Sequence, residues 1–373
     1  MSKDDIGVVI DAGSQYTKAG FSADTFPRCV VPTVVGRFRR AGLLDGIPTI
    51  YCGADAVRNR GISHLTWPVR DGLIQDWDEM EKLWHYVFYK HLHVPPDEAR
   101  IMHAVHPLME RKDKEKMAEI LFETFAISGL YLAKSPALVL HASGKTSGVV
   151  WENGYSCSYA APVFEGFPLN YSTITSQLSG EALTARLQTL MAANGYSFTT
   201  AIERELLNQI KVDVCYISQD YAAEIKSSSS ENKVRYDLPD GQHVLLGDER
   251  FQCPEVMFQP ALAGLNCQSV TDTICSSITK CDEDYRTLFY NNIVISGGSS
   301  KFPGLSKRLL AELTLKPKTL AKVNVNVDGI PNRQYATWVG GSLLASLGSM
   351  KGFWLTSEEY EDAGSDRVSY KFF

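Results

Sequence analysis

One short pattern occurs twice in this chain, and it constrains the fold more than any other feature. Residues 7–15 read GVVIDAGSQ and residues 148–156 read GVVWENGYS. In each copy an apolar run leads to a carboxylate, one spacer and a glycine, and a second strand-like stretch follows at residues 16–21 and 157–163. This arrangement predicts two β-hairpins. Apolar-Asp-x-Gly is also a common strand ending, so chance is the alternative. The placement of the copies, at the start of the chain and of its second half, favours duplication.

Composition excludes several classes of protein. The 373 residues are 44% hydrophobic, which is enough to bury a large core, and this excludes a disordered or fibrous chain. The formal net charge of −6 argues against a dedicated nucleic-acid binder. No apolar run is long enough for a membrane span, and the acidic start is not typical of a signal peptide. The eight cysteines are scattered without a C-x-x-C pair, which favours reduced side chains in a cytosolic or nuclear protein.

The rest of the chain mixes strand and helix patterns. Residues 292–298 form a third apolar run that ends in two glycines and leads towards a helix-patterned segment at 305–313. Helix patterns also occupy residues 77–84, 110–125 and 203–216, and residues 234–238 are strand-like. Strands alternating with helices in two related halves predict an α/β protein with two lobes around a cleft.

The two predicted hairpin tips could bind a polyphosphate together. Gly13, Ser14 and Gly154 would supply backbone donors, and Asp11 and Glu152 would hold a hydrated Mg²⁺ ion. Lys18 could reach a phosphate oxygen. The alternative is that the two carboxylates only cap their turns and that Lys18 is a surface residue. Spacing alone does not separate the two interpretations.

At this point the sequence resembles the actin-related proteins, from Gly7 to Phe373. The motifs that carry the resemblance are DAGS at 11–14, KAGF at 18–21, PVRDG at 68–72, WDEMEKLW at 77–84, ASG at 142–144, GYSFTT at 195–200, LPDGQ at 238–242, SGG at 296–298 and WVGGSLLASL at 338–347. The resemblance implies the actin-like ATPase fold, with two duplicated lobes of two subdomains each around a central nucleotide cleft. The implied boundaries are residues 1–31, 68–134 and 335–373 for subdomain 1, 32–67 for subdomain 2, 135–178 and 268–334 for subdomain 3, and 179–267 for subdomain 4.

The resemblance also implies a ligand, ATP or ADP with Mg²⁺. The residues that match the family's nucleotide contacts are Gly13, Ser14, Lys18, Gly154, Gly180, Lys211, Gly297, Gly298 and Phe302. Asp11 and Glu152 match the positions that hold the metal through water.

Departures from the family pattern make ATP hydrolysis doubtful. Gln15 replaces a glycine of the first hairpin, so either Gln15 is strained or the turn has changed shape. The second hairpin has Glu152 for the usual aspartate, lacks the next acid and glycine, and carries Tyr159 where the family has a histidine. The glutamine that usually positions the attacking water is replaced by Ser135, which is too short for that task and is followed by Pro136.

Contacts to the adenosine are also reduced. Val212 follows Lys211 where the family has a glutamate, and residues 331–334 read PNRQ where the family has PERK. Each lost polar contact costs about 1 kcal/mol or more of binding, so three or four together weaken nucleotide affinity by several powers of ten. We therefore expect slow or absent hydrolysis and weak or lost nucleotide binding. The competing view is that the remaining residues still hold ATP or ADP tightly as a structural ligand.

Two surfaces are expected to bind partners, which are other actin-like subunits or actin itself, or proteins with an amphipathic helix. The loop at residues 39–48 places Leu43, Leu44 and Ile47 between glycines, although it could instead fold back on its own lobe. The groove at the family's barbed end keeps its apolar character at Gly144, Thr146, Phe167, Leu344 and Leu347. No direct nucleic-acid or membrane partner is expected.

The sequence thus favours a structural or adaptor subunit of a larger cytoskeletal assembly, which could be ciliary, sperm-specific or dynein-associated. The first alternative is an ATP-binding, filament-forming actin-like protein, and the second is a nuclear subunit of a chromatin remodeller. The expected location is the cytoplasm and cytoskeleton, with the nucleus as the alternative.

Overall fold

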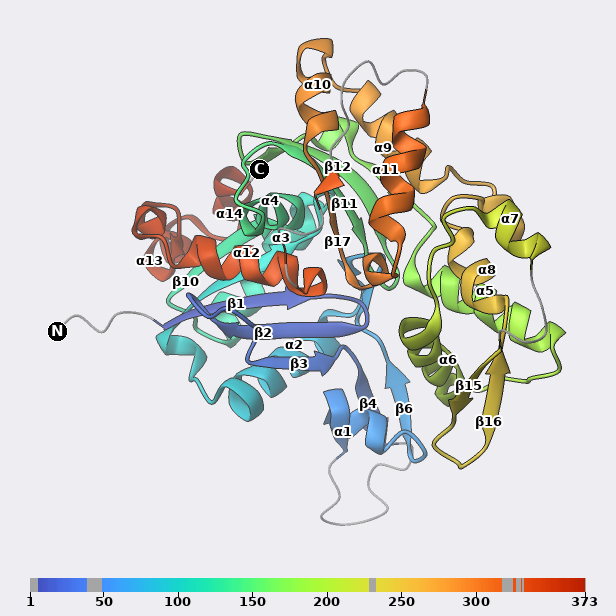
Figure 1. Cartoon of the computed structure of the whole chain (residues 1–373). Helices are drawn as coiled ribbons and strands as arrows, with labels where there is room; N and C mark the ends of the chain where they lie inside the picture. The colour runs from blue at the N-terminus through green and yellow to red at the C-terminus, as the bar shows by residue number, and fades with distance from the viewer. Residues whose placement is uncertain are drawn as a thin grey trace. The chain divides into compact units, whose positions relative to one another are not determined.

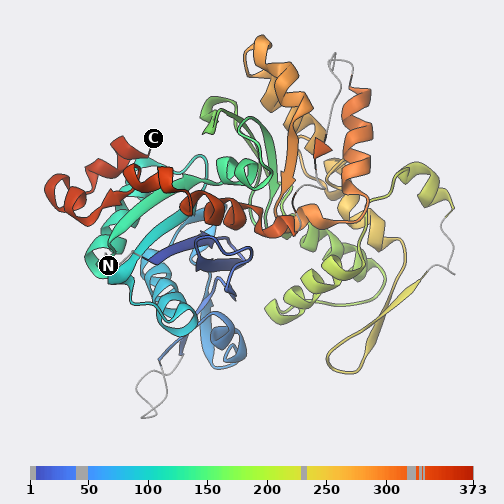
Figure 2. The same ribbon diagram turned by 60° about the vertical axis from the view of Figure 1, so that its left-hand side comes forward.

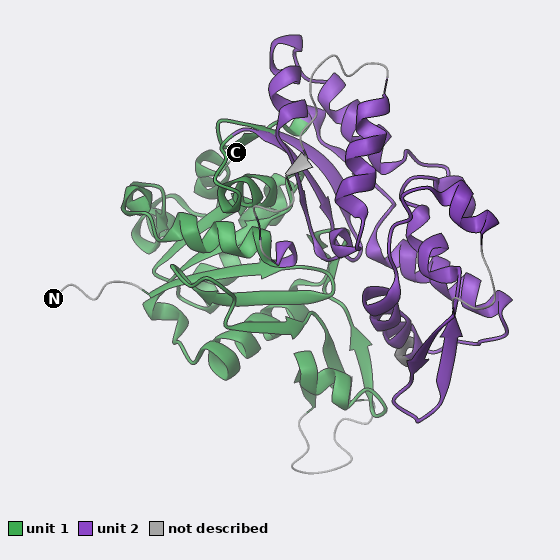
Figure 3. Ribbon diagram, in the orientation of Figure 1, with its two compact units in different colours: residues 1–146, 163–170, 335–373 green, residues 147–162, 171–334 purple. Residues whose placement is uncertain are grey.

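The computed structural model describes residues 6–38, 49–227, 233–316, 325–326, 330 and 332–372. The chain divides into two compact units (Figure 3). Unit 1 comprises residues 1–146, 163–170 and 335–373, and unit 2 comprises residues 147–162 and 171–334. The expected subdomain boundaries are finer than this division and stay a prediction.

Unit 1 is built on a six-stranded mixed sheet with the order β19-β10-β9-β1-β2-β3. Its strands are β1 (Ile6–Ala12), β2 (Tyr16–Phe21), β3 (Cys29–Pro32), β9 (Ala99–Val105), β10 (Gly129–Lys134) and β19 (Leu355–Thr356). The first three form an antiparallel meander, and β1, β9 and β10 are parallel to one another. The hairpin expected at residues 7–21 is therefore confirmed as β1 and β2, which are drawn in blue in Figures 1 and 2.

The second sheet has the order β13-β12-β11-β17-β18, and β14 is a further partner of β12; the path β14-β12-β11-β17-β18 in unit 2 repeats the path β3-β2-β1-β9-β10 of unit 1. Its strands are β11 (Gly148–Asn153), β12 (Ser158–Phe164), β14 (Ile174–Ser176), β17 (Ile293–Ser296) and β18 (Val325–Asn326). On one side of the β11–β12 hairpin, β14 pairs antiparallel with β12, as β3 does with β2 in unit 1. On the other side, β17 pairs parallel with β11, and β18 pairs parallel with β17. The last residues of β12 pair with β13 (Phe167–Pro168), and this end of the hairpin belongs to unit 1. The shared strand order confirms the duplication that the repeated pattern predicted.

The helices begin where local sequence favours it. Asp76 caps α2 by accepting a hydrogen bond from the Glu79 amide, and Thr200 and Glu203 form a capping box at the start of α6. The expected helices are found, with small shifts in their ends and π-helical turns after α2 and α3, at Val87–Leu92 and Ile120–Thr124. The helices are α1 (Gly53–Arg58), α2 (Trp77–Tyr86), α3 (Arg111–Glu119), α4 (Ser135–Ala142), α5 (Gly180–Ala193), α6 (Ala201–Val214), α7 (Tyr221–Lys226), α8 (Glu249–Glu255), α9 (Val270–Thr279), α10 (Glu283–Asn291), α11 (Leu305–Leu315), α12 (Ala336–Ala345), α13 (Ser357–Ala363) and α14 (Asp366–Lys371).

Smaller sheets complete the units. In unit 1, β5 (Ile50–Cys52), β4 (Val35–Phe38) and β6 (Ser63–Thr66) form a three-stranded sheet, and β7 (Val69–Arg70) pairs with β8 (Leu73–Ile74). In unit 2, β15 (Val234–Asp237) and β16 (His243–Leu246) form a two-stranded ribbon that extends from the helices, as both views show (Figures 1 and 2). Among the described helices, none has the length and apolar character needed to cross a membrane.

The core of unit 1 depends on a close crossing of α4 and α12. Trp338 on α12 is fully buried and donates its indole hydrogen to the Val9 carbonyl of β1 at 3.0 Å. Gly340 faces α4 so closely that a Cβ atom there would lie 1.8 Å from the Leu138 carbonyl oxygen. Glycine at this position therefore sets how near the two helices approach each other.

Candidate functional site

The first hairpin places its charged residues opposite each other. Asp11 and Lys18 are cross-strand partners, and the Lys18 Nζ donates to the Asp11 carboxylate at 2.9 Å. Both side chains are largely buried, with 17% and 15% exposed, so Lys18 is not a free surface residue. The turn itself closes with the Gly13 amide donating to the Tyr16 carbonyl at 3.1 Å. The expected residues of this tip, including the half-buried Ser14, thus lie together in unit 1.

Gln15 adopts an ordinary backbone conformation. It does not belong to the described non-glycine residues with positive φ, which are Ala23, Asp71, His93, Ala126, Glu165 and Asn332. Its carbonyl accepts a hydrogen bond from the Thr33 amide of the next loop at 2.9 Å. Of the two expectations for Gln15, strain is therefore wrong: this turn does not require the left-handed conformation that favours glycine.

Ser135, at the position of the lost glutamine, is the first residue of α4. Its hydroxyl donates to the Val105 carbonyl at the end of β9 at 3.0 Å. Pro136 lies in the first turn of the helix, where its missing amide hydrogen has no helical acceptor to lose. The Ser-Pro pair therefore makes a well-formed helix start, and the Ser135 hydroxyl is already used by the backbone.

The second hairpin has the same turn as the first but a different pair of side chains. The Gly154 amide donates to the Cys157 carbonyl at 2.8 Å, as Gly13 does to Tyr16. Glu152 takes the place of Asp11, and Tyr159 takes the place of Lys18, seven residues later in each copy. The Tyr159 hydroxyl donates to Glu152 Oε2 at 2.6 Å. Tyr159 is 3% exposed, so this contact is held inside the sheet of unit 2.

Glycines from three segments of unit 2 meet around this tip. The Gly180 amide at the start of α5 donates to the Gly154 carbonyl at 2.9 Å, and the next amide, of Glu181, donates to the Tyr155 carbonyl at 2.6 Å. Gly297 follows β17 in the chain and has a φ of 89°. It lies so close to β11 that a Cβ atom at Gly297 would be 2.3 Å from the Asn153 carbonyl oxygen. These contacts bring the expected glycines together and occupy two amides at the start of α5.

Of the remaining expected residues of unit 2, Lys211 and Phe302 are buried and Gly298 is exposed. Lys211 on α6 is 2% exposed and donates to the Gly180 carbonyl at 2.7 Å and to the Thr184 hydroxyl at 2.8 Å. Burial lowers the pKa of Lys211 to about 8. Phe302 is 6% exposed, whereas a Cβ atom at Gly298 would meet nothing within 4 Å. Lys211 thus anchors the first turn of α5, and its contact with a nucleotide stays a prediction.

The donor set does not suit a directly bound metal ion. Asp11 is bonded to Lys18 and Glu152 to Tyr159, each within its own hairpin. Across the described part of the chain, no group of three or more His, Cys, Asp or Glu side chains is placed to hold a metal ion. A hydrated Mg²⁺ ion would have to compete with these partners for each carboxylate.

The expected partner-binding residues of the apolar groove all belong to unit 1. Phe167 is 64% exposed on β13, which follows a two-residue turn at Glu165-Gly166 with positive φ at both residues. Thr146 accepts the Gly166 amide at 2.8 Å, and Gly144 ends α4 in the left-handed conformation. At the end of α12, Leu344 is half-buried and Leu347 is 52% exposed. Leu43, Leu44 and Ile47 lie outside the described residues.

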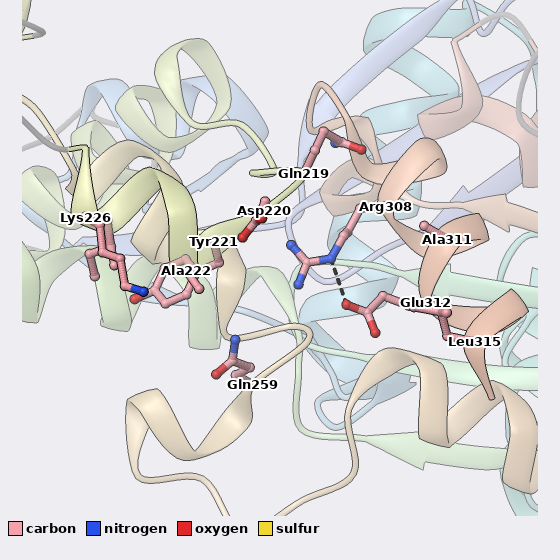
Figure 4. A pocket seen from close by; sticks show the side chains of 11 residues that line it. Gln219, Asp220, Tyr221, Ala222, Lys226, Gln259, Arg308, Ala311, Glu312 and Leu315 are labelled. Atoms are coloured by element: carbon pink, nitrogen blue, oxygen red, sulfur yellow. Dashed lines mark hydrogen bonds and ion pairs between the residues drawn. The ribbon is translucent and has the colours of Figure 1, made fainter. Parts of the chain in front are cut away.

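Unit 2 also has a pocket of about 530 Å³ that the sequence did not indicate (Figure 4). Its wall includes Arg308 of α11, whose guanidinium is held by Glu312 at 2.8 Å, by buried Glu255 at 3.2 Å and by the Ser218 carbonyl at 2.8 Å. The other lining residues are Gln219, Asp220, Tyr221, Ala222, Ile225, Lys226, Gln259, Ala311 and Leu315. The Arg308 cation is thus committed to protein partners.

Comparison with known families identifies the fold. The family described as Actin matches residues 3–373, which is essentially the whole chain. The chain belongs to the actin family. Its mixed α/β structure, with two sheets of the same strand order, is consistent with the actin-like fold.

In this actin-family chain, the buried histidine His103 on β9, opposite Ile10 of β1, predicts that the folded protein loses stability in acid. Burial lowers the pKa of His103 to about 4, while its hydrogen bond to the Ala104 carbonyl and the Asp11 charge oppose that shift. The unfolded chain takes up a proton below about pH 6.5 and the folded protein only below about 4, so stability falls between these values, by up to about 3 kcal/mol. Urea unfolding at pH 7, 6 and 5 should show a smaller loss for His103→Leu than for the wild type. Parallel curves would contradict the assignment.

Sequence reasoning missed two contacts of this site. It named Tyr159 as a departure from the actin pattern but not as a partner of Glu152, although the seven-residue spacing common to both hairpins could have indicated the pair. It also missed Ser299, whose hydroxyl lies 3.3 Å from the Gly154 carbonyl. No sequence signal pointed to that contact, because it joins segments far apart in the chain.

Proposed function

We propose that this actin-family chain is a structural or adaptor subunit of a larger cytoskeletal assembly, with weak or absent ATP hydrolysis. The observation that carries the proposal is the environment of Ser135. Its hydroxyl hydrogen is donated to the Val105 carbonyl and its side chain is short, so Ser135 lacks the reach of a glutamine and has no second donor with which to orient a water molecule. Family resemblance places the missing water-positioning glutamine at this residue.

The second hairpin supports weak nucleotide binding. ATP or ADP remains the ligand that the actin fold implies, but the amide of Gly154, an expected phosphate donor, already donates to the Cys157 carbonyl, as that of Gly13 does to the Tyr16 carbonyl in the first hairpin. A phosphate would gain little from donors that must first break internal hydrogen bonds. The metal-side carboxylate, Glu152, is likewise bonded to Tyr159.

The apolar surface of unit 1 supports a role in assembly. Phe167 and Leu347 are large exposed apolar side chains on β13 and next to α12, and both elements join α4 within one unit. We propose that they receive an amphipathic helix or another actin-like subunit. The proposed location is the cytoplasmic cytoskeleton, and a nuclear assembly is the alternative.

Sedimentation and phosphate release test the proposal together. The purified chain is incubated with Mg-ATP, with and without conventional actin, and both pelleted protein and released phosphate are measured. We expect no phosphate release above the protein-free control and no pelleting of the chain alone. Self-assembly coupled to phosphate release would instead establish a nucleotide-switched filament former.

A matched variant examines Ser135 itself. Because the Ser135 hydroxyl bonds only backbone in the described contacts, Ser135→Ala should leave phosphate release unchanged. If the wild type does release phosphate, a clear fall in Ser135→Ala would show that Ser135 takes part in hydrolysis, against the proposal.

A further inference from the structure

Tyr159 carries an inference that rests on the proposed function and deepens it. In the first hairpin, the carboxylate of Asp11 is paired with a cation, Lys18, at 2.9 Å. In the second hairpin, the equivalent carboxylate of Glu152 is paired with a neutral hydroxyl, that of Tyr159, at 2.6 Å. The two copies thus use the same seven-residue spacing to engage each carboxylate from the neighbouring strand.

The surroundings hold Tyr159 in place. It lies on β12 opposite Thr175 of β14 and is 3% exposed, while Glu152 on β11 lies opposite Ser296 of β17. Strands on both sides therefore fix the two residues in register, and rotation of the tyrosine away from the carboxylate would require space in a packed sheet. A 2.6 Å contact is also the length typical of a strong hydroxyl-to-carboxylate hydrogen bond.

We propose that Tyr159 is a specificity-determining residue that weakens the part of Glu152 in metal binding, so that Mg²⁺ adds little to the affinity of this chain for a nucleotide. A hydrated cation needs the carboxylate oxygens as acceptors for its water molecules. Glu152 Oε2 already accepts the Tyr159 hydrogen, so a water molecule of the cation would have to compete with that bond.

The test is a titration of the full chain with ATP in EDTA and in excess MgCl₂. For the wild type we expect the same affinity in both conditions, or the same undetectable binding. Tyr159→Phe keeps the ring but removes the hydrogen bond to Glu152, so Mg²⁺ should increase the ATP affinity of this variant about tenfold. The double variant Tyr159→Phe with Glu152→Gln should lose this gain. Tyr236→Phe is the matched control, because it removes another tyrosine-to-carboxylate bond, to Asp213 at 2.9 Å, away from the hairpin.

The other outcomes overturn the inference. These are a Mg²⁺-dependent affinity in the wild type, the absence of a gain in Tyr159→Phe, or an equal gain in Tyr236→Phe. If Tyr159→Phe does not fold, the single variant Glu152→Gln tests the inference instead. Its ATP affinities in EDTA and in MgCl₂ should be the same as those of the wild type. A failure of the proposed function is seen in a different experiment: the wild type would release phosphate and assemble by itself in the sedimentation test.

Discussion

Replacement of Arg308 by methionine is expected to reduce the free energy of unfolding by about 3–5 kcal/mol. Arg308 lies between Glu255 and Glu312, and the Glu255 side chain is fully buried. Loss of the cation leaves a buried carboxylate without its charged partner, and the remaining hydrogen bond from Gln259, at 2.9 Å, does not replace it. Urea unfolding at neutral pH measures the loss.

The pH dependence of this variant identifies the cause. Burial raises the pKa of Glu255 already in the wild type, and Arg308 opposes that shift. Without Arg308, the folded-state pKa rises further above the unfolded value, so the penalty is full at high pH and is relieved as pH falls through the folded-state pKa. We therefore expect the difference from the wild type to narrow between pH 7.5 and pH 5.

Two further variants complete this experiment. Arg235→Met breaks an exposed pair with Asp237, so it should cost less than about 1 kcal/mol. Arg308→Met combined with Glu255→Leu should recover much of the loss, because no buried charge is left unpaired. A double variant as unstable as Arg308→Met would show that packing, and not charge, determines the effect.

Gly340→Ala is expected to be the second severe change, with a loss of about 3 kcal/mol. The added Cβ atom would lie 1.8 Å from the Leu138 carbonyl oxygen and 2.5 Å from its carbon. Both are backbone atoms, so α4 or α12 must move as a whole. Movement of α12 would also disturb the hydrogen bond from Trp338 to Val9.

Thermal unfolding followed by tryptophan fluorescence checks this expectation. Gly348→Ala is the control, since a Cβ atom there meets nothing within 4 Å and should change stability by less than about 0.5 kcal/mol. Equal melting temperatures for the two variants would contradict the close crossing. If Gly340→Ala folds, its affinity for a partner at Phe167 and Leu347 should also fall, because β13, which carries Phe167, and α12, which precedes Leu347, both pack against α4.

Local sequence was sufficient for much of the architecture. The repeated pattern at residues 7–15 and 148–156 predicted both hairpins, and their turns indeed close with equivalent hydrogen bonds at Gly13 and Gly154. The helices predicted at 77–84 and 203–216 are present as α2 and α6, with ends shifted by two residues, because apolar periodicity and capping act within a few residues. The same motifs predicted the actin family, which the whole-chain match confirms.

The candidate site was predicted less completely. The sequence named the glycines at 154, 180 and 297, and the structure brings them together in unit 2. The sequence could not show that the first two amides of α5 donate hydrogen bonds to carbonyls of the second hairpin tip. Nor could it show that the Ser135 hydroxyl donates to the Val105 carbonyl. These contacts depend on how separate segments pack, and residue type does not specify them.

The sequence by itself determined the two-copy organisation, the family and the positions at which this chain departs from the family. The tertiary structure decided what two of those departures do: Tyr159 engages Glu152, and Gln15 is unstrained. It also decided the part of Gly340, in a motif shared with the family, which sets the approach of α12 to α4. The physical reason is range. Turn closure and helix capping involve neighbouring residues, whereas a cross-strand hydrogen bond or a helix crossing requires the register and packing of the folded chain.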